Sequence, residues 1–149
     1  MCGIVGSFGI GSTSSEIELR VPELKHRGPD HQGFESFGEY CHMGVARLAM
    51  TDPFPRSNQP MYSKANNVSI SFNGEIYNFR ELRQNLIDNG QDFKTESDTE
   101  VLLEYLAKYG NQALGKLQGM FAIAFFDEVK QSILLARDFL GKKPLYFSM

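Results

Sequence analysis

Two apolar segments near the end of the chain are separated by only four residues. Residues 120–127 and 132–137 are rich in β-branched and aromatic side chains, and Glu128-Val129-Lys130-Gln131 joins them. Two such segments linked by a short turn predict a β-hairpin, so at least one antiparallel sheet is expected. Residues 145–147, Leu-Tyr-Phe, predict the start of another strand.

The middle of the chain predicts two helices. Apolar residues recur at three- and four-residue intervals from Phe79 to Leu86, and Gly90 then supplies a stop. Ser97 with Glu100 three residues later matches a capping box, and the apolar helical pattern that follows ends at a glycine.

A weaker helix is predicted over residues 16–25. Ile17, Leu19 and Leu24 are its expected core contacts, and Pro22 limits its length. Residues 26–33 are dense in turn-forming and charged residues and predict a loop. Residues 51–67 contain three prolines and predict a second, longer loop, of a length that is often functional in a compact domain.

Asn73-Gly74-Glu75 follows a short segment, residues 68–72, whose alternation predicts a strand with one buried face. An Asn-Gly pair most often makes a hairpin turn, but a helical pattern comes next. We therefore predict a strand-to-helix junction here. Backbone N–H groups and an amide side chain converge at such a place, and together they can stabilise an oxyanion.

Cys2 directly follows the initiator methionine and begins a segment, residues 2–8, that predicts a short buried strand. If Met1 is removed, one residue carries both a thiol and a free α-amine. An α-amine has an ordinary pKa of about 7.7–8.0 and can act as the base for its own nucleophile. The alternative is that Cys2 is a small apolar residue packed in the interior, as free cysteines usually are.

Arg47 lies in a predicted strand over residues 40–50, and Asp98 lies in the first turn of a predicted helix. The structural interpretation is an ion pair or edge position for the arginine and a favourable helix-dipole interaction for the aspartate. The alternative is a site for a zwitterion, in which Arg47 binds an α-carboxylate and Asp98 binds an α-ammonium. Sequence spacing leaves both interpretations open.

Composition excludes several classes of protein. The 149 residues fit one domain, and the net charge of −3 has no basic surface suited to nucleic acid or to a membrane. Two cysteines do not make a disulfide scaffold, and no secretory signal or membrane-spanning stretch is present, so a cytoplasmic protein is expected. No residues have zinc-site spacing, and no Gly-rich phosphate loop with its lysine occurs.

Several short motifs occur in one order along nearly the whole chain. Together they resemble the class II glutamine amidotransferase domain, which implies an α+β fold of the N-terminal-nucleophile hydrolase type, a four-layer αββα sandwich over residues 1–149. Arg27-Gly28-Pro29-Asp30 and Lys143-Pro144-Leu145-Tyr146 are most similar to the glutaminase domain of glutamine-hydrolysing asparagine synthetases. The other motifs are Cys2-Gly3-Ile4-Val5-Gly6, Arg47-Leu48, Asn73-Gly74-Glu75-Ile76-Tyr77-Asn78, Ser97-Asp98, Leu117-Gln118-Gly119-Met120-Phe121-Ala122 and the run from Arg137 to Lys142.

The resemblance implies a role for each candidate residue. Cys2 attacks the side-chain amide of L-glutamine, and Asn73 and Gly74 form the oxyanion hole. Arg47 binds the α-carboxylate and Asp98 the α-ammonium, while the backbone of Leu48, Ala49, Met50, Thr51 and Glu75 completes the pocket. The stretch from Arg27 to Asp30 is expected to support the site from behind. No metal or cofactor is expected in this chain, because ATP and magnesium belong to a synthetase domain or subunit that would receive the ammonia.

Two departures from the family pattern carry expectations of their own. Ala46 stands where an acidic residue often precedes the arginine. The family's domain also usually continues for several strands beyond the Lys-Pro-Leu-Tyr motif, so a C-terminally truncated domain is expected. An open sheet edge favours pairing with another chain, and a homo-oligomer or reduced stability is predicted.

The sequence leaves two alternative functions open. The first is a catalytically silent glutamine-binding or subunit-interaction module, which retained Met1 would produce. The second is an amidotransferase domain serving an acceptor other than aspartate.

Overall fold

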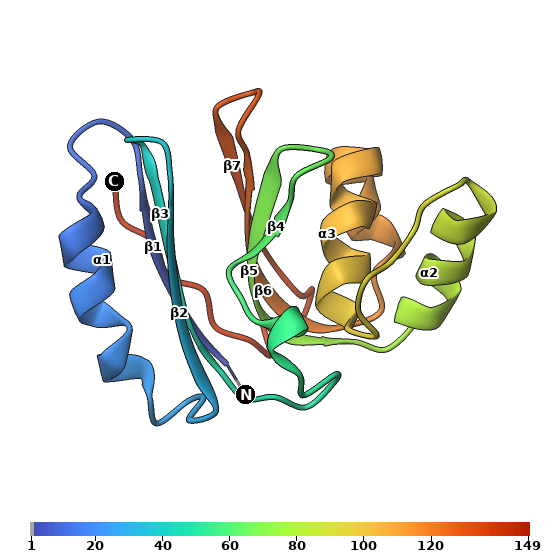
Figure 1. The fold of residues 1–149 in the computed structure, drawn as a ribbon, viewed down its shortest axis with the longest axis horizontal. Helices are drawn as coiled ribbons and strands as arrows, with labels where there is room; N and C mark the ends of the chain where they lie inside the picture. The colour runs from blue at the N-terminus through green and yellow to red at the C-terminus, as the bar shows by residue number, and fades with distance from the viewer. Residues whose placement is uncertain (1) are drawn as a thin grey trace.

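A computed structural model describes residues 2–149 and contains two β-sheets packed face to face between helical layers (Figure 1). The first sheet has the strand order β1-β3-β2, and the second has the order β4-β5-β6-β7. Helix α1 covers the outer face of the first sheet, whereas α2 and α3 lie on the outer side of the second (Figure 1). This is the αββα arrangement predicted from the resemblance.

The first sheet is built around β3 (Cys41–Arg47), every residue of which is buried. Both neighbours run antiparallel to it: β1 (Gly3–Phe8) pairs Gly3 with Ala46, and β2 (His31–Phe37) pairs His31 with Arg47. The predicted loop over residues 26–33 was therefore wrong at its end, because His31 to Gly33 already pair with β3.

Helix α1 (Ser14–Arg20) and a 3₁₀ turn, η1 (Pro22–Leu24), pack on this sheet. The contact is close because β3 presents Gly44, where a Cβ would stand 2.4 Å from a methyl carbon of Val21. Ile17 is buried as predicted, but Leu19 is 74% exposed and was wrongly assigned to the core. Leu19 follows Ile17 by two residues, and residues at that spacing do not share a face of a helix.

The second sheet contains the predicted hairpin, formed by β6 (Gly119–Asp127) and β7 (Ser132–Arg137). Strand β5 (Val68–Ile76) pairs with β6 along its whole length, and the short β4 (Met61–Ser63) pairs with the beginning of β5. The expected strand-to-helix junction at Asn73-Gly74 was wrong, because both residues lie inside β5 opposite Ala122 and Phe121. Residues 145–147 form no strand, and β4 lies within the predicted loop over residues 51–67.

Helices α2 (Phe79–Asp88) and α3 (Asp98–Tyr109) pack against the second sheet and enclose the larger hydrophobic core. Ser97 caps α3 as predicted, since its hydroxyl accepts from the N–H of Thr99 at 3.0 Å. Glu100 does not complete the capping box on Ser97. Its carboxylate instead accepts from the N–H groups of Lys94 and Thr95 at 2.9 and 2.7 Å, which fixes the turn that leads into the helix. Two 3₁₀ segments, η2 (Pro55–Ser57) and η3 (Gly110–Lys116), complete the fold.

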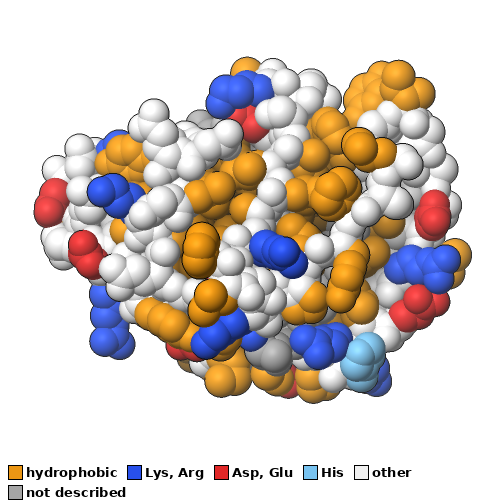
Figure 2. Space-filling view, turned by 180° about the vertical axis from the view of Figure 1, so that it is seen from behind, with side chains coloured by type: hydrophobic (Ala, Val, Ile, Leu, Met, Phe, Trp, Pro, Cys, Tyr) orange, Lys and Arg blue, Asp and Glu red, His pale blue; other side chains and the backbone are white. Residues whose placement is uncertain are grey.

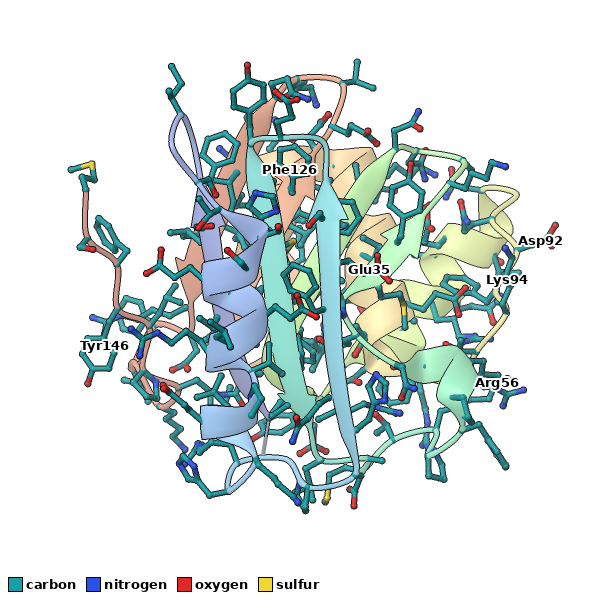
Figure 3. All side chains as sticks on the ribbon, turned by 60° about the vertical axis from the view of Figure 1, so that its left-hand side comes forward. Glu35, Arg56, Asp92, Lys94, Phe126 and Tyr146 are labelled. Carbon is teal, nitrogen blue, oxygen red and sulfur yellow. The ribbon has the colours of Figure 1, made fainter. Side chains whose placement is uncertain are left out.

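A second, smaller cluster joins the two sheets. Cys41 and Met43 of β3 pack against Phe126 of β6, which is labelled in Figure 3. Burial raises the pKa of the Cys41 thiol to about 12, so this thiol stays protonated in the core. Cys2 and Cys41 are both free.

Large hydrophobic side chains remain exposed on the segment after β7, among them Phe139, Tyr146 and Phe147. Tyr146 projects away from the sheets in Figure 3. Figure 2 views the molecule from behind and shows hydrophobic side chains gathered over the middle of that face. Among residues 2–149 there is no helix of the length and apolarity needed to cross a bilayer.

Candidate active site

Cys2 immediately precedes β1 and lies beside the end of β3. The antiparallel register that pairs Gly3 with Ala46 carries Cys2 to the level of Arg47 and Leu48. The Cys2 thiol is partly buried and donates a weak hydrogen bond to the carbonyl oxygen of Leu48, with 3.9 Å between sulfur and oxygen. The cysteine is therefore at a sheet end rather than in the core, unlike Cys41. The state of Met1 lies outside the described residues.

A pocket of about 140 Å³ opens beside this thiol. It brings together most of the residues predicted from the sequence, although they come from the residue before β1, from β3, β5 and α3, and from the loop after β3. Ala49 and Asn73 are not in its lining, and Phe72, Gln59, Ser97, Thr99 and Met120 are additions that sequence reasoning missed. The predicted residues that line it are Cys2, Arg47, Leu48, Met50, Thr51, Gly74, Glu75 and Asp98.

The backbone of β5 supplies the pocket with a free donor. Tyr77 donates to Gln118 and Glu128 donates to Asn67, which shows that the odd-numbered residues of β5 hydrogen-bond towards β6. The N–H groups of the even-numbered residues therefore point to the opposite edge. Phe72 and Ile76 donate there to side chains at 2.7 and 3.1 Å, whereas the N–H of Gly74, between them, has no acceptor among residues 2–149.

Only glycine fits at position 74. A Cβ there would lie 2.1 Å from the carbonyl oxygen of Met120 and 2.7 Å from the Cα of Phe121. Gly74 and Phe121 are a non-hydrogen-bonded pair, at which β5 and β6 approach too closely for any side chain at position 74.

The side chain of Asn73 has no hydrogen-bond partner within the described chain, and its Oδ1 atom is fully buried. A buried amide without a partner is unfavourable, and such groups are often completed by a ligand or water. Asn73 is 5% exposed. Oδ1 is an acceptor, so only the Nδ2 group of this amide could act as an oxyanion donor, beside the free backbone N–H of Gly74.

Arg47 is buried and forms four hydrogen bonds, all with the loop that follows β3. Its Nη1 donates to Phe54 O and Asn58 Oδ1 at 3.3 and 2.9 Å, and its Nη2 donates to Thr51 O and Asp52 O at 3.1 and 2.7 Å. The guanidinium thus shapes the pocket wall, with both terminal nitrogens engaged. A carboxylate would have to reach Nε or replace one of these carbonyl oxygens.

Asp98 is the first residue of α3 and is 4% exposed. Its Oδ1 accepts from the Thr51 hydroxyl at 2.9 Å and its Oδ2 from the N–H of Ile76 at 3.1 Å. Burial raises the pKa of Asp98, and the nearby Glu75 carboxylate raises it further, which outweighs these hydrogen bonds. A cation bound beside Asp98 would stabilise the ionised carboxylate, so the site favours an ammonium.

The turn at residues 27–30 supports the pocket from behind. Asp30 donates its N–H to Arg47 O at 3.1 Å, and its Oδ2 accepts from the N–H of Ala49 at 2.8 Å. At Gly28 a Cβ would lie 2.2 Å from Ala46 O, so the turn contacts β3 directly. Ala46 itself is fully buried between β1 and β2.

No group of three histidine, cysteine, aspartate or glutamate residues suited to a metal ion occurs in the described part of the chain. The pocket lining offers a thiol, the free N–H of Gly74, a guanidinium and a carboxylate, and the buried amide of Asn73 adjoins Gly74 in the chain. This set is suited to acyl transfer from a zwitterionic substrate.

Comparison with solved structures identifies the class of fold. A glutamine phosphoribosylpyrophosphate amidotransferase of Bacillus subtilis superposes with a TM-score of 0.66 at 22% identity, over 93% of this chain and 37% of that one. An allosteric regulatory enzyme of purine biosynthesis gives a TM-score of 0.70 at 20% identity and the same coverage. Two facing sheets between helices, with a cysteine at the start of the first strand, define an N-terminal-nucleophile hydrolase fold.

The chain belongs to the glutamine amidotransferase domain family, which matches residues 1–149. Hydrolysis of glutamine to glutamate and ammonia is the general function of such domains. The glutamine-hydrolyzing asparagine synthetase 2 of Oryza sativa subsp. japonica is 38% identical over 150 residues, which are 98% of this chain and 25% of that protein. Asparagine synthetase 1 of Bacillus subtilis (strain 168) is 39% identical over 155 residues, which are 99% of this chain and 24% of that protein. The chain thus spans about a quarter of the length of these relatives.

Proposed function

We propose that this chain hydrolyses the side-chain amide of L-glutamine through a thioester on Cys2. The observation that carries the proposal is the open N–H of Gly74 in the same pocket as the Cys2 thiol and the buried carboxylate of Asp98. The substrate's α-ammonium would lie at Asp98 and its α-carboxylate at Arg47, which orients the side-chain amide towards Cys2.

The reaction needs a free α-amine on Cys2 and therefore removal of Met1. The amine takes the thiol proton as sulfur attacks the amide carbon, and the N–H of Gly74 with the Asn73 amide stabilises the resulting oxyanion. The carbon–nitrogen bond breaks as the amine returns the proton to nitrogen, and ammonia leaves. Water, deprotonated by the same amine, then attacks the thioester. The carbon–sulfur bond breaks, the amine returns the proton to the sulfur, and glutamate leaves.

The ammonia would pass to a synthetase domain or subunit of the asparagine-synthetase type, with aspartate as the acceptor. The 37–39% identity to such synthetases supports this acceptor. In this proposal ATP and magnesium bind to the synthetase part and not to residues 1–149. Association of identical chains stays a prediction, and light scattering at several protein concentrations would test it.

A glutaminase assay with three proteins tests the proposal. The wild type should release glutamate, Cys2→Ala should release none, and Asn73→Ala should lose about 10²–10³ in kcat while remaining folded. A normal rate in either variant would overturn the assignment of that residue.

Mass spectrometry after exposure to an electrophilic glutamine analogue tests processing and site together. A single adduct on an N-terminal Cys2 is expected. Cys41 is an internal control, since its thiol is fully buried and its pKa is raised to about 12. A chain that retains Met1 and takes no adduct would instead favour a silent glutamine-binding or interaction module.

A further inference from the structure

The N–H groups of Phe72, Gly74 and Ile76 all point to the edge of β5 that faces the pocket. Two of the three donate hydrogen bonds to side chains. Gln59 Oε1 accepts from Phe72 at 2.7 Å, and Asp98 Oδ2 accepts from Ile76 at 3.1 Å. The strand pairing on this side ends at Met61 with Ile70. Beyond that point Gln59, which lies just before β4, and Asp98, at the start of α3, take the place of a neighbouring strand and leave the N–H of Gly74 open.

Gln59 is 4% exposed and lines the pocket. While its oxygen holds Phe72, its Nε2 donates to the hydroxyl of Thr99 in the first turn of α3 at 3.3 Å. One amide therefore connects the β5 edge, where an oxyanion would bind, to the helix start that carries Asp98. The proposed mechanism assigns no role to this residue.

We propose that Gln59 is a positioning residue that holds the edge of β5 in place. Of the N–H groups of Phe72, Gly74 and Ile76, only that of Gly74 is then available to substrate, at the place where the oxyanion forms. This inference rests on the proposed function. A donor contributes to catalysis only when it is fixed in advance at the position of the developing charge, and a displacement of about 1 Å can lower a rate about 10²-fold.

The role predicts a separation between turnover and ground-state binding. Gln59→Met keeps the length of the side chain but removes the acceptor, so kcat should fall about 10- to 100-fold. Glutamate binds through its α-groups at Arg47 and Asp98 and needs no oxyanion hole, so its Kd should change less than about 3-fold. If Gln59 only kept the pocket assembled, Kd would weaken together with kcat.

Two further variants sharpen the comparison. Gln59→Glu retains an oxygen for the N–H of Phe72 and should recover kcat several-fold over Gln59→Met. Gln84→Met is the matched control: Gln84 is exposed on α2 and its amide contacts only Asp88, so kcat should not change. Equal kcat values in Gln59→Met and wild type would overturn the inference.

Hydrogen exchange on the wild-type protein tests the geometry without any variant. The amides of Phe72 and Ile76 should be protected, and the Gly74 amide between them should exchange far faster. Similar protection at all three would overturn the inference even if Gln59→Met failed to fold. A wild type without Cys2-dependent glutaminase activity would refute the proposed function instead, and the exchange pattern would still decide whether Gly74 is the free donor.

Discussion

The hydroxyl of Thr51 donates to Oδ1 of Asp98 at 2.9 Å and joins the loop after β3 to the first residue of α3. The backbone carbonyl of the same threonine accepts from Arg47. The guanidinium and the carboxylate that would bind the two α-groups of a substrate are therefore parts of one hydrogen-bonded unit. Their separation is set by the loop and not by contact between the two side chains.

Replacing Arg47 with lysine should damage this unit although the charge is kept. A lysine ammonium has three donors on one nitrogen and cannot reproduce a fork that engages four acceptors. We expect a loss of about 2–4 kcal/mol in the free energy of unfolding and at least about a tenfold fall in kcat/KM for glutamine. Urea unfolding and steady-state kinetics measure the two effects. Wild-type values for both would show that the four bonds contribute nothing.

Asp98→Asn should separate binding from stability. Asparagine can still accept from Ile76 and can donate to the Thr51 hydroxyl, so both contacts of the carboxylate survive. The charge that would pair with an ammonium is lost, and glutamine affinity should fall by about 10²-fold, the effect of breaking a buried charge pair of about 3 kcal/mol. Isothermal titration with the Cys2→Ala protein measures this loss without turnover.

The same substitution should change the dependence of stability on pH. Burial and Glu75 raise the folded-state pKa of Asp98 above its ordinary value of 3.8. The contribution of Asp98 to stability is therefore fully present below that ordinary value and is lost as pH rises through the raised pKa. Unfolding free energies of wild type and Asp98→Asn, measured between about pH 4 and pH 8, should diverge in favour of the variant as pH rises. Parallel curves would contradict the raised pKa.

The parts of the fold that were predicted correctly from the sequence are those set by residues close together in the chain. The hairpin of β6 and β7 and the start of α3 at Ser97 each depend on residues within a few positions of one another. Asn73-Gly74 was misplaced because its local signal is a turn, whereas pairing with Phe121 and Ala122 holds it inside a strand. That partner lies more than 40 residues away, and no local pattern reports it.

The site likewise contains residues that the sequence reveals and residues that only the folded structure reveals. Cys2, Arg47 and Asp98 have side chains whose chemistry is conspicuous in the sequence, and the structure brings them to one pocket. Gln59 was missed because a neutral amide in a proline-rich loop carries no local signal of its contacts. Its importance depends on Phe72 and Thr99, which only the folded chain places on either side of it.

Gly74→Ala should disrupt both the sheet and the site. The new methyl group would lie 2.1 Å from Met120 O, so β5 and β6 would have to separate. We expect a destabilisation of about 2–4 kcal/mol and loss of glutaminase activity. Gly115→Ala is the matched control, because a Cβ there meets nothing within 4 Å, and its stability should stay within about 0.5 kcal/mol of wild type. Equal unfolding midpoints for the two variants would refute the steric argument.

Asp138→Asn should weaken the connection between β6 and the segment after β7. The carboxylate accepts from the N–H groups of Lys142, Lys143 and Phe121 at 2.8, 3.0 and 3.1 Å, and an amide NH₂ in place of one oxygen cannot accept. A buried donor left without a partner costs about 1–3 kcal/mol, so the variant should be less stable by that amount at neutral pH. Asp92→Asn, at an exposed side chain that points away from the protein (Figure 3), should change stability by less than about 0.5 kcal/mol.

The pH dependence of this variant should be opposite to that of Asp98→Asn. Burial alone would raise the pKa of Asp138, but the backbone hydrogen bonds outweigh it and lower the pKa below the ordinary 3.8. The stability that Asp138 contributes is present above that value and is lost as pH falls through the lowered folded-state pKa. The difference in unfolding free energy between wild type and Asp138→Asn should therefore shrink on acidification. A difference that stayed constant from neutral pH into the acid unfolding range would show that the bonds do not favour the ionised carboxylate.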